Sequence, residues 1–255
     1  MGCDIHFHME ALKKGKWAEI PGPLRPCFSC ADKPEPDPKC YWCKGKGTRH
    51  EEWYDGRNYH LFAILASVRN GYGFAGIKTG EGFIPIAPPR GLPEDVSRRV
   101  AAESDKWGCD GHSHSWHNLQ HLLDYNWDQT STLQGVISIA EYFHWRQACA
   151  DAGKALCPGT YSGGIMGKDI ATVTAASADK LLLDKVVKIT WNEAESRFRD
   201  ESSDGVRYFV LVRWEETYRE AIGEHFFRDA VEPMKEFASQ YGGNDKVRIV
   251  FWFDN

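Results

Sequence analysis

The chain has 255 residues and a mass of 28.9 kDa, which fits one large domain or a domain with a small insertion. Hydrophobic residues make up 42% and charged residues 26%, and this balance excludes wholesale disorder. The net charge of -5 argues against a broad basic face for duplex nucleic acid, but it is compatible with a local basic channel. The apolar runs are too short to span a bilayer, so we expect no membrane association.

The N-terminal part of the chain predicts a hairpin, a cysteine-rich insertion and a helix. Polar and apolar side chains alternate with a period of two in residues 4–10, which is typical of a half-buried strand. Residues 13–16 predict a turn, and residues 17–20 predict the returning strand of a hairpin. Residues 21–50 contain cysteines and prolines but little material for a core. Residues 58–69 predict a helix, because apolar side chains recur along one stripe.

The rest of the chain predicts helices placed between further strands. Strands at both ends with helices between them indicate the α+β class. We therefore expect a single mixed sheet whose N- and C-terminal strands are central, with flanking helices. The expected helices cover residues 93–103, 118–123, 137–152, 171–185 and 218–241, and the expected strands cover residues 186–191, 207–213 and 247–253.

Two Cys-x-x-Cys pairs lie in the cysteine-rich segment. Two residues between cysteines let both thiolates reach one ion, and two such pairs supply the four sulfurs of a tetrahedral zinc site. A redox pair and unliganded thiols are the alternatives. The sequence thus predicts a main α+β domain over residues 1–20 and 51–255 and a structural zinc-knuckle insertion over residues 21–50. The predicted zinc ligands are Cys27, Cys30, Cys40 and Cys43.

The second cysteine pair continues as Cys-x-x-Cys-x-Gly-x-Gly over residues 40–47. This element resembles the one in the DnaJ cysteine-rich domain, where glycines let the chain fold back around the metal. The resemblance covers only this short segment and no J-domain is visible, so it implies zinc binding and not chaperone function. Its basic and aromatic neighbours could contact a partner; they are Trp42, Lys44, Lys46 and Arg49.

Two segments share the pattern Asp-x-His-x-His, and in an extended chain these three side chains project to one side. Imidazole and carboxylate groups are good ligands for zinc, manganese or iron, and such an ion lowers the pKa of bound water. We expect both segments to form one site for a second, exchangeable zinc or manganese ion. The alternative is a polar strand face whose histidines only form hydrogen bonds. The predicted ligands are His6, His8, His112 and His114, next to Asp4 and Asp110.

Both segments also resemble motifs of hydrolases. Residues 112–117 are similar to the His-x-His-x-Asp-His signature of metallo-β-lactamase-type enzymes, with Trp116 in the aspartate position. Residues 4–8 are similar to the first-strand metal motif of PHP and amidohydrolase proteins, but the βα alternation of those barrels is missing. Residues 112–115 contain the His-x-Ser element of 2H phosphoesterases without the second copy.

The C-terminal segment is nearly all apolar over residues 247–253 and predicts a covered, central strand. If this strand pairs with residues 4–10, Asp254 joins the histidine cluster. Asp4, Asp110 and Asp254 are then candidates for a further metal ligand or a general base. For Asp254 a solvated terminus is the alternative.

Four segments together resemble a family of uncharacterised proteins from tailed phages and their bacterial hosts. The match runs from one end of the chain to the other and implies a phage-associated protein of the host bacterial cytoplasm. The N-terminus has no secretory signal, which agrees with that compartment. The segments are residues 1–6, 91–95, 112–115 and 248–255.

Two functional hypotheses follow. The leading one is a metal-dependent hydrolase that acts on a phosphodiester or nucleotide and carries a structural zinc knuckle. The alternative is a non-enzymatic phage factor that binds a host protein, or sequesters a nucleotide or single-stranded nucleic acid, through the knuckle and exposed aromatic side chains. Metal content distinguishes them, because one zinc ion per chain favours the binding factor and two or more ions favour the enzyme.

Overall fold

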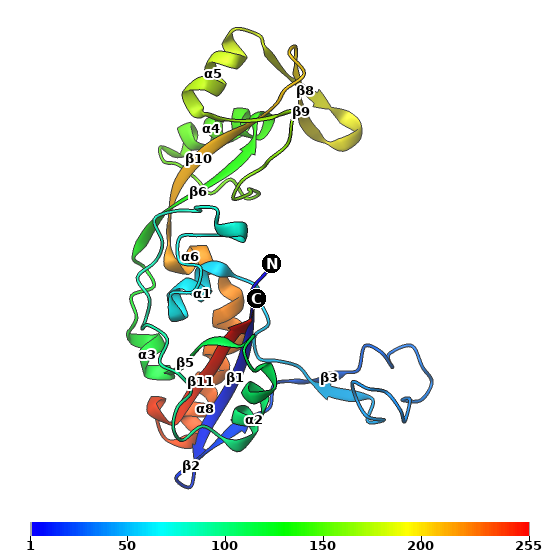
Figure 1. Cartoon of the computed structure of the whole chain (residues 1–255), viewed down its shortest axis with the longest axis vertical. Coiled ribbons are helices and arrows are strands. Elements are labelled where there is room, and N and C mark those ends of the chain that lie inside the picture. The colour runs from blue at the N-terminus through cyan, green and yellow to red at the C-terminus, as the bar shows by residue number, and fades with distance from the viewer. Residues whose placement is uncertain (1, 255) are drawn as a thin grey trace. The chain divides into compact units, whose positions relative to one another are not determined.

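The computed structural model describes residues 2–254, which divide into two compact units. Unit 1 comprises residues 2–68, 84–126 and 222–254, and unit 2 comprises residues 69–83 and 127–221. Both units contain helices and sheets, so the expected mixed α+β class is found. Figure 1 labels the elements of each unit. No helix in residues 2–254 combines the length and the apolar character that a membrane span requires.

Unit 1 is built on a four-stranded antiparallel sheet with the order β2-β1-β11-β5. The two central strands are β1 (Asp4–Lys13) and β11 (Val247–Asp254), which come from opposite ends of the chain. Their register runs from Asp4 opposite Asp254 to Ala11 opposite Val247. The expected pairing of the terminal strands is therefore present.

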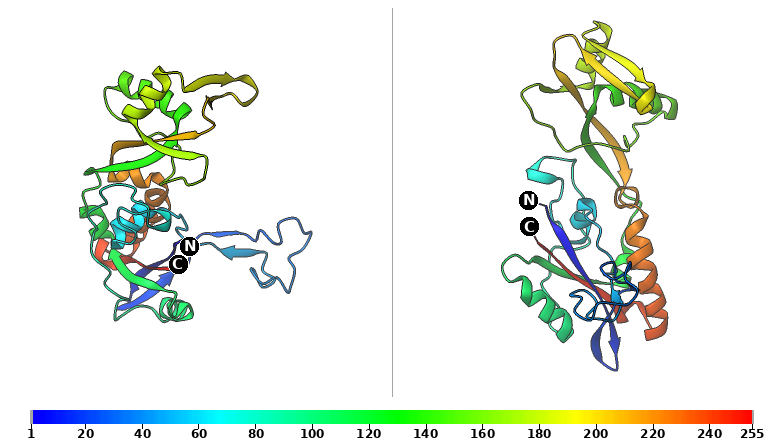
Figure 2. Two further views of the ribbon diagram at one scale, coloured as in Figure 1. Left: turned by 45° about the horizontal axis from the view of Figure 1, so that its top comes forward. Right: turned by 90° about the vertical axis from the view of Figure 1, so that its right-hand side faces the viewer.

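The alternating pattern of β1 gives the sheet of unit 1 two different faces. Phe7 points to the face covered by helix α8 (Glu232–Tyr241), where it contacts Phe226. His6 points to the other face, where it contacts Trp107 of α2. Figure 2 shows α2 and α8 on opposite sides of the sheet. The apolar core thus lies on the α8 side, and the predicted site residues of β1 lie on the α2 side.

The remaining elements of unit 1 cover these faces or form an arm. The polypeptide continues from α7 through a short π-helix, Phe227–Val231, directly into α8. The strands are β2 (Lys16–Ile20), β3 (Leu24–Pro26), β4 (Thr48–His50) and β5 (His112–Asn118), and the helices are α1 (Tyr59–Ala66), α2 (Arg98–Trp107), α3 (Leu119–Asp124), α7 (Glu224–Phe226), α8 (Glu232–Tyr241) and the short 3-10 turn Asn244–Lys246.

Unit 2 contains a second sheet of three strands, with the order β6-β10-β7. Strand β10 pairs antiparallel with β6 and parallel with β7. A separate hairpin is formed by β8 and β9. The elements are β6 (Thr130–Ser138), α4 (Ile139–Ala152), β7 (Ile170–Thr174), α5 (Ala175–Leu183), β8 (Val187–Asn192), β9 (Arg197–Ser202), β10 (Arg207–Thr217), the 3-10 turns Phe74–Gly76 and Glu193–Glu195, and α6 (Tyr218–Ile222), whose last residue belongs to unit 1.

The expectation of a single mixed sheet is wrong, because the described residues form four separate sheets. The sequence did not predict β6. Its Thr and Ser residues interrupt the apolar pattern, so the alternation of buried positions is not visible in the sequence. It also predicted one helix over residues 171–185. The β-branched residues of Ile170–Thr174 form strand β7 instead, and helix α5 begins only after the N-cap Thr174.

A buried ion pair joins the two terminal strands to the start of α2. The guanidinium of Arg248 donates to Glu10 at 2.8 Å and to Asp95 at 2.7 Å, and it lies 3.9 Å from the ring centre of Trp17. The other carboxylate oxygen of Glu10 accepts the backbone N–H of Ser97, the N-cap residue of α2. Glu10 and Arg248 are both buried. Removal of Arg248 would leave the carboxylate of Glu10 inside the protein without its ion-pair partner.

We expect Arg248→Met to lower the free energy of unfolding of unit 1 by about 3–5 kcal/mol, because Glu10 loses its buried partner. Hydrogen exchange of the β1 and β11 amides measures this loss. The control Arg228→Met removes an exposed pair with Asp229 and should cost at most about 1 kcal/mol. Equal effects of the two substitutions would contradict the assigned role of Arg248.

Candidate functional site

The cysteine-rich insertion forms an arm of unit 1 with a two-stranded stem. Strands β3 and β4 pair over three residues each, and the N–H of Cys27 donates to the carbonyl of Gly47 at 2.8 Å to close the end of the stem. Figures 1 and 2 show the arm extending from the sheet. Gly47 has a φ of +72°, and a Cβ atom there would lie 2.7 Å from the Pro36 ring. The glycine therefore lets the two halves of the loop approach closely.

The four cysteine sulfurs of the arm converge on one point. The Sγ atoms of Cys27 and Cys40 are 3.8 Å apart, those of Cys30 and Cys43 are 3.7 Å apart, and all four lie within 4.8 Å of one another. A tetrahedron with Zn–S bonds of about 2.3 Å has sulfur–sulfur edges of about 3.8 Å. The separations are far too long for a disulfide, which needs about 2.05 Å. The four cysteines could thus hold a metal ion such as zinc.

The surroundings of the sulfurs favour a thiolate at one of them. A backbone hydrogen bond from Cys43 is the main cause that lowers the pKa of Cys40 to about 6. Burial raises the pKa of Cys27. Because zinc binds the thiolate form, the lowered pKa of Cys40 favours metal binding at this sulfur.

On the α2 side of the sheet, three imidazoles surround one buried indole. The ring centre of Trp252 lies 5.6 Å from His6, 4.9 Å from His8 and 5.5 Å from His114, and all three pairs are stacked. Trp107 of α2 lies 3.9 Å from His6. Three of the four predicted histidines therefore share one face, but the indole of Trp252 occupies the space between them.

The acidic residues near the chain ends are already engaged. Asp4 forms two hydrogen bonds of 2.6 Å with Arg57, which is the main reason that its pKa is lowered. Asp254 accepts the backbone N–H of Asp4 and lies 3.4 Å from Nε2 of His6. Burial lowers the pKa of His6, and the contact with Asp254 only partly offsets this. His6 is thus a neutral imidazole beside a carboxylate.

His112 lies on the opposite face of the sheet from His114. Strand β5 shifts register between Phe251 and Phe253 of β11, and Ser113 has a φ of +53°. This bulge adds one residue, so His112 pairs with Phe253 on the core side. Asp110 lies in the exposed turn after α2. The second Asp-x-His-x-His segment therefore does not present its three side chains on one side as expected.

The described residues 2–254 contain no group of three or more potential metal ligands placed around one point other than the four cysteines. His6, His8, His112 and His114 do not form such a group, for two reasons already given. Trp252 separates the imidazoles on one face, and the bulge turns His112 away. The structure gives no support for the second metal ion.

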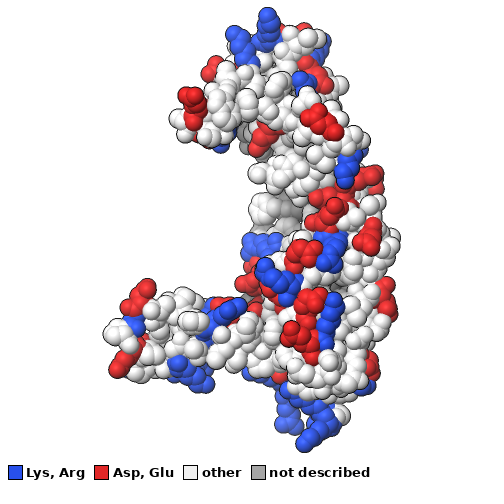
Figure 3. Space-filling model, turned by 180° about the vertical axis from the view of Figure 1, so that it is seen from behind, with Lys and Arg blue, Asp and Glu red and all other residues white. Residues whose placement is uncertain are grey.

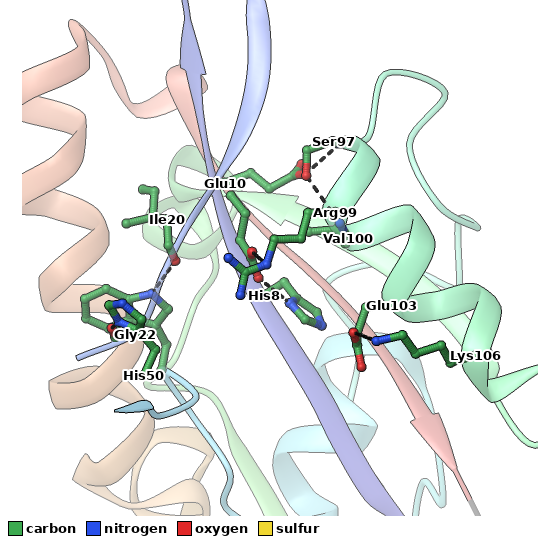
Figure 4. Close-up of polar contacts among 12 residues, drawn as sticks. His8, Glu10, Ile20, Gly22, His50, Ser97, Arg99, Val100, Glu103 and Lys106 are labelled. Atoms are coloured by element: carbon green, nitrogen blue, oxygen red, sulfur yellow. Dashed lines mark hydrogen bonds and ion pairs between the residues drawn. The ribbon is translucent and has the colours of Figure 1, made fainter. Parts of the chain in front are cut away.

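The face instead carries a cavity that sequence patterns did not reveal. It has a volume of about 270 Å³ and lies between β1, β2, α2 and the segment after β4. Figure 4 shows Arg99 of α2 projecting toward His8 and Glu103 of the same helix in contact with Lys106. Nδ1 of His8 contacts Glu19 at 2.9 Å, and Glu19 also contacts Arg99 at 2.6 Å. The polar lining consists of His6, His8, Glu19, His50, Glu51, Glu52, Arg99 and Glu103.

Two glutamates of this cavity have pKa values that move in opposite directions. Burial would raise the pKa of Glu19, but the hydrogen bond to His8 and the charge of Arg99 outweigh it and lower the pKa. Glu52 lines the same cavity and remains in contact with solvent. Partial desolvation by the surrounding protein raises the pKa of its carboxyl. The cavity lining thus includes a carboxyl that ionises readily, Glu19, and one that keeps its proton to a higher pH, Glu52.

Among the residues that line the cavity, Glu19 could have been predicted from the two-residue turn of the β1–β2 hairpin. With Lys13 opposite Lys16, Glu19 falls opposite Glu10 and on the same face as His8. Arg99, Glu103 and Glu52 come from segments distant in sequence, and no local pattern indicates them.

The chain matches no protein-family model, no curated protein and no solved structure in our comparisons. The chemistry of the two sites therefore follows from their own residues. These sites are the cysteine centre of the arm and the cavity beside His8.

A fully buried histidine of β5 makes unit 1 sensitive to acid. Nε2 of His117 lies 2.8 Å from the carbonyl oxygen of Leu65, and burial lowers its pKa to about 4. In the unfolded chain a histidine has a pKa of about 6.5. The unfolded state therefore binds the proton more readily, and stability is lost as the pH falls from about 6.5 toward 4.

We expect His117→Gln to flatten this pH dependence by up to about 1.4 kcal/mol per pH unit. Urea unfolding of unit 1 at several pH values between neutrality and pH 4 measures it. His225→Gln, at an exposed position of the same unit, is the control that leaves the burial of His117 intact. Unchanged acid sensitivity in His117→Gln would show that another group causes it.

We expect Cys40→Ser to abolish metal binding at the arm, because only three thiolates remain. Zinc content measured by mass spectrometry should fall to near zero. Limited proteolysis should then cut within residues 21–50 while the rest of the chain stays folded. The exposed Cys109→Ser is the control and should keep its zinc. Full zinc content in Cys40→Ser would contradict the assignment.

Proposed function

We propose that this protein is a binding factor that recognises its partner through the arm, and that a zinc ion at the four cysteines holds the arm in shape. The observation that carries the proposal is the exposure of large apolar side chains beside the only metal-ligand group of residues 2–254. Tyr41 is 82% exposed, Phe28 58% and Trp42 52%. All three lie within or next to the two Cys-x-x-Cys pairs.

An arm that is held together by a metal ion can leave large apolar side chains in solvent, because it does not need them to form a core. The buried side chains that pack together in the arm are the four cysteines themselves. A clustered patch of exposed aromatic rings is a feature of interaction sites. We therefore assign the rings to the contact with a partner and the metal to the shape of the arm.

A hydrolase is the second candidate, and the cavity beside His8 is what favours it. Glu19 holds Nδ1 of His8, which is the arrangement that orients an imidazole for acid–base catalysis. The cavity lining has four glutamates and one arginine, so its formal charge is -3 with neutral histidines. That charge repels a phosphodiester unless a bound cation compensates for it.

The resemblance of the chain to tailed-phage and bacterial proteins adds a setting to this proposal. We infer that the factor acts in the cytoplasm of a bacterial host, where reducing conditions keep its cysteines available for zinc.

Metal stoichiometry separates the two candidates. After dialysis against zinc or manganese, we expect one ion per chain in the wild type and the same value in His6→Ala/His8→Ala. The cysteine centre does not involve these histidines. A second ion that disappears in the double variant, together with hydrolysis of bis(p-nitrophenyl) phosphate lost in His8→Ala, would overturn the binding factor in favour of the hydrolase.

A further inference from the structure

The exposed rings of the arm form one cluster, in which Trp42 is tilted by 56° against Phe28 and meets Tyr41 edge to face. The ring centres of Phe28 and Trp42 are 5.3 Å apart, and those of Tyr41 and Trp42 are also 5.3 Å apart. The guanidinium of Arg49 lies 5.0 Å from the Phe28 ring centre and 5.9 Å from that of Trp42. Three neighbouring rings with a cation beside them offer stacking surfaces for several planar groups.

The positive charges of the arm concentrate on the same part of the loop. Residues 38–50 contain four lysines or arginines and no acidic residue. The acidic residues of the arm lie in residues 32–37, where Asp37 is paired with Lys33. Figure 3 shows basic side chains along the arm and toward its base and acidic ones at its tip. The basic residues of this stretch are Lys39, Lys44, Lys46 and Arg49, of which Arg49 lies over the rings of Phe28 and Trp42.

We propose that the arm binds single-stranded nucleic acid, with bases stacked on Phe28, Tyr41 and Trp42 and the backbone phosphates near Lys44, Lys46 and Arg49. This inference rests on the proposed function and names its partner. Unstacked bases present flat faces to aromatic side chains, whereas a duplex keeps them inside its stack. The overall charge of -5 gives no broad basic face for a duplex.

The first test measures the rings. Fluorescence anisotropy of labelled oligothymidylate and oligouridylate should show binding to the zinc-loaded wild type, and a labelled duplex should bind more weakly. Trp42→Ala should weaken single-strand binding roughly 5- to 150-fold, the range for one stacked base. Trp191→Ala is the matched control, because Trp191 of unit 2 is also 52% exposed and should leave binding unchanged.

The second test measures the charges. Lys44→Ala/Lys46→Ala should reduce the slope of log K against log salt by about 1.4, since each cation on a single strand contributes about 0.7. Lys14→Ala/Lys16→Ala is the matched control, because it removes the same two charges with the same spacing from the β1–β2 turn. Zinc content of every variant shows that the arm keeps its structure.

Three outcomes would overturn the inference. These are no binding of either oligonucleotide, equal losses in Trp42→Ala and Trp191→Ala, or tighter binding of the duplex than of the single strand. A labelled polyglutamate peptide that binds through Trp42 while the oligonucleotides do not would identify a protein partner, and it would leave the proposed binding factor intact. The metal stoichiometry experiment, in contrast, tests that proposed function itself.

Discussion

The pairing of the first strand with the last strand is the constraint on which unit 1 depends. Strand β11 is buried along almost its whole length, so β1 and β5 must cover its edges and helices must cover both its faces. Glu10 and Arg248 fix this pairing from within, and Glu10 also accepts the N-cap N–H of α2. The same contacts that hold the sheet thus place α2 over His6 and His8 and create the cavity there.

Local patterns predicted the elements that local chemistry determines. The alternation in residues 4–10 predicted the first strand. The cysteine spacing predicted a group of four ligands, all of which come from one short segment of the chain. Three features depend on longer-range structure, so no local pattern indicates them. The bulge at Ser113 places His112 on the other face of the sheet. In β6, polar residues lie between the buried apolar positions and obscure their alternation. Arg99 and Glu103, which line the cavity, come from a helix that is remote in sequence.

The histidine face shows why a ligand-like pattern need not make a metal site. A period of two puts His6 and His8 on one side of β1, but it says nothing about the neighbouring strand. There Trp252 fills the gap between the imidazoles, and burial keeps His6 and His114 neutral by lowering each pKa. These rings pack around a buried indole, and two of them contact polar side chains, His8 with Glu19 and His114 with Ser104.

The two candidate sites of unit 1 differ in charge, and they therefore favour different kinds of ligand. The cavity beside His8 has four glutamates against one arginine, whereas residues 38–50 of the arm have four basic residues and no acid. An anionic strand is therefore attracted to the arm and repelled by the cavity. A zinc ion held by all four cysteines would have every position filled by protein, so it would shape the arm and leave no open position for hydrolysis. The proposed binding of a nucleic acid strand would thus use residues of the arm, whereas cleavage of its backbone would require other residues.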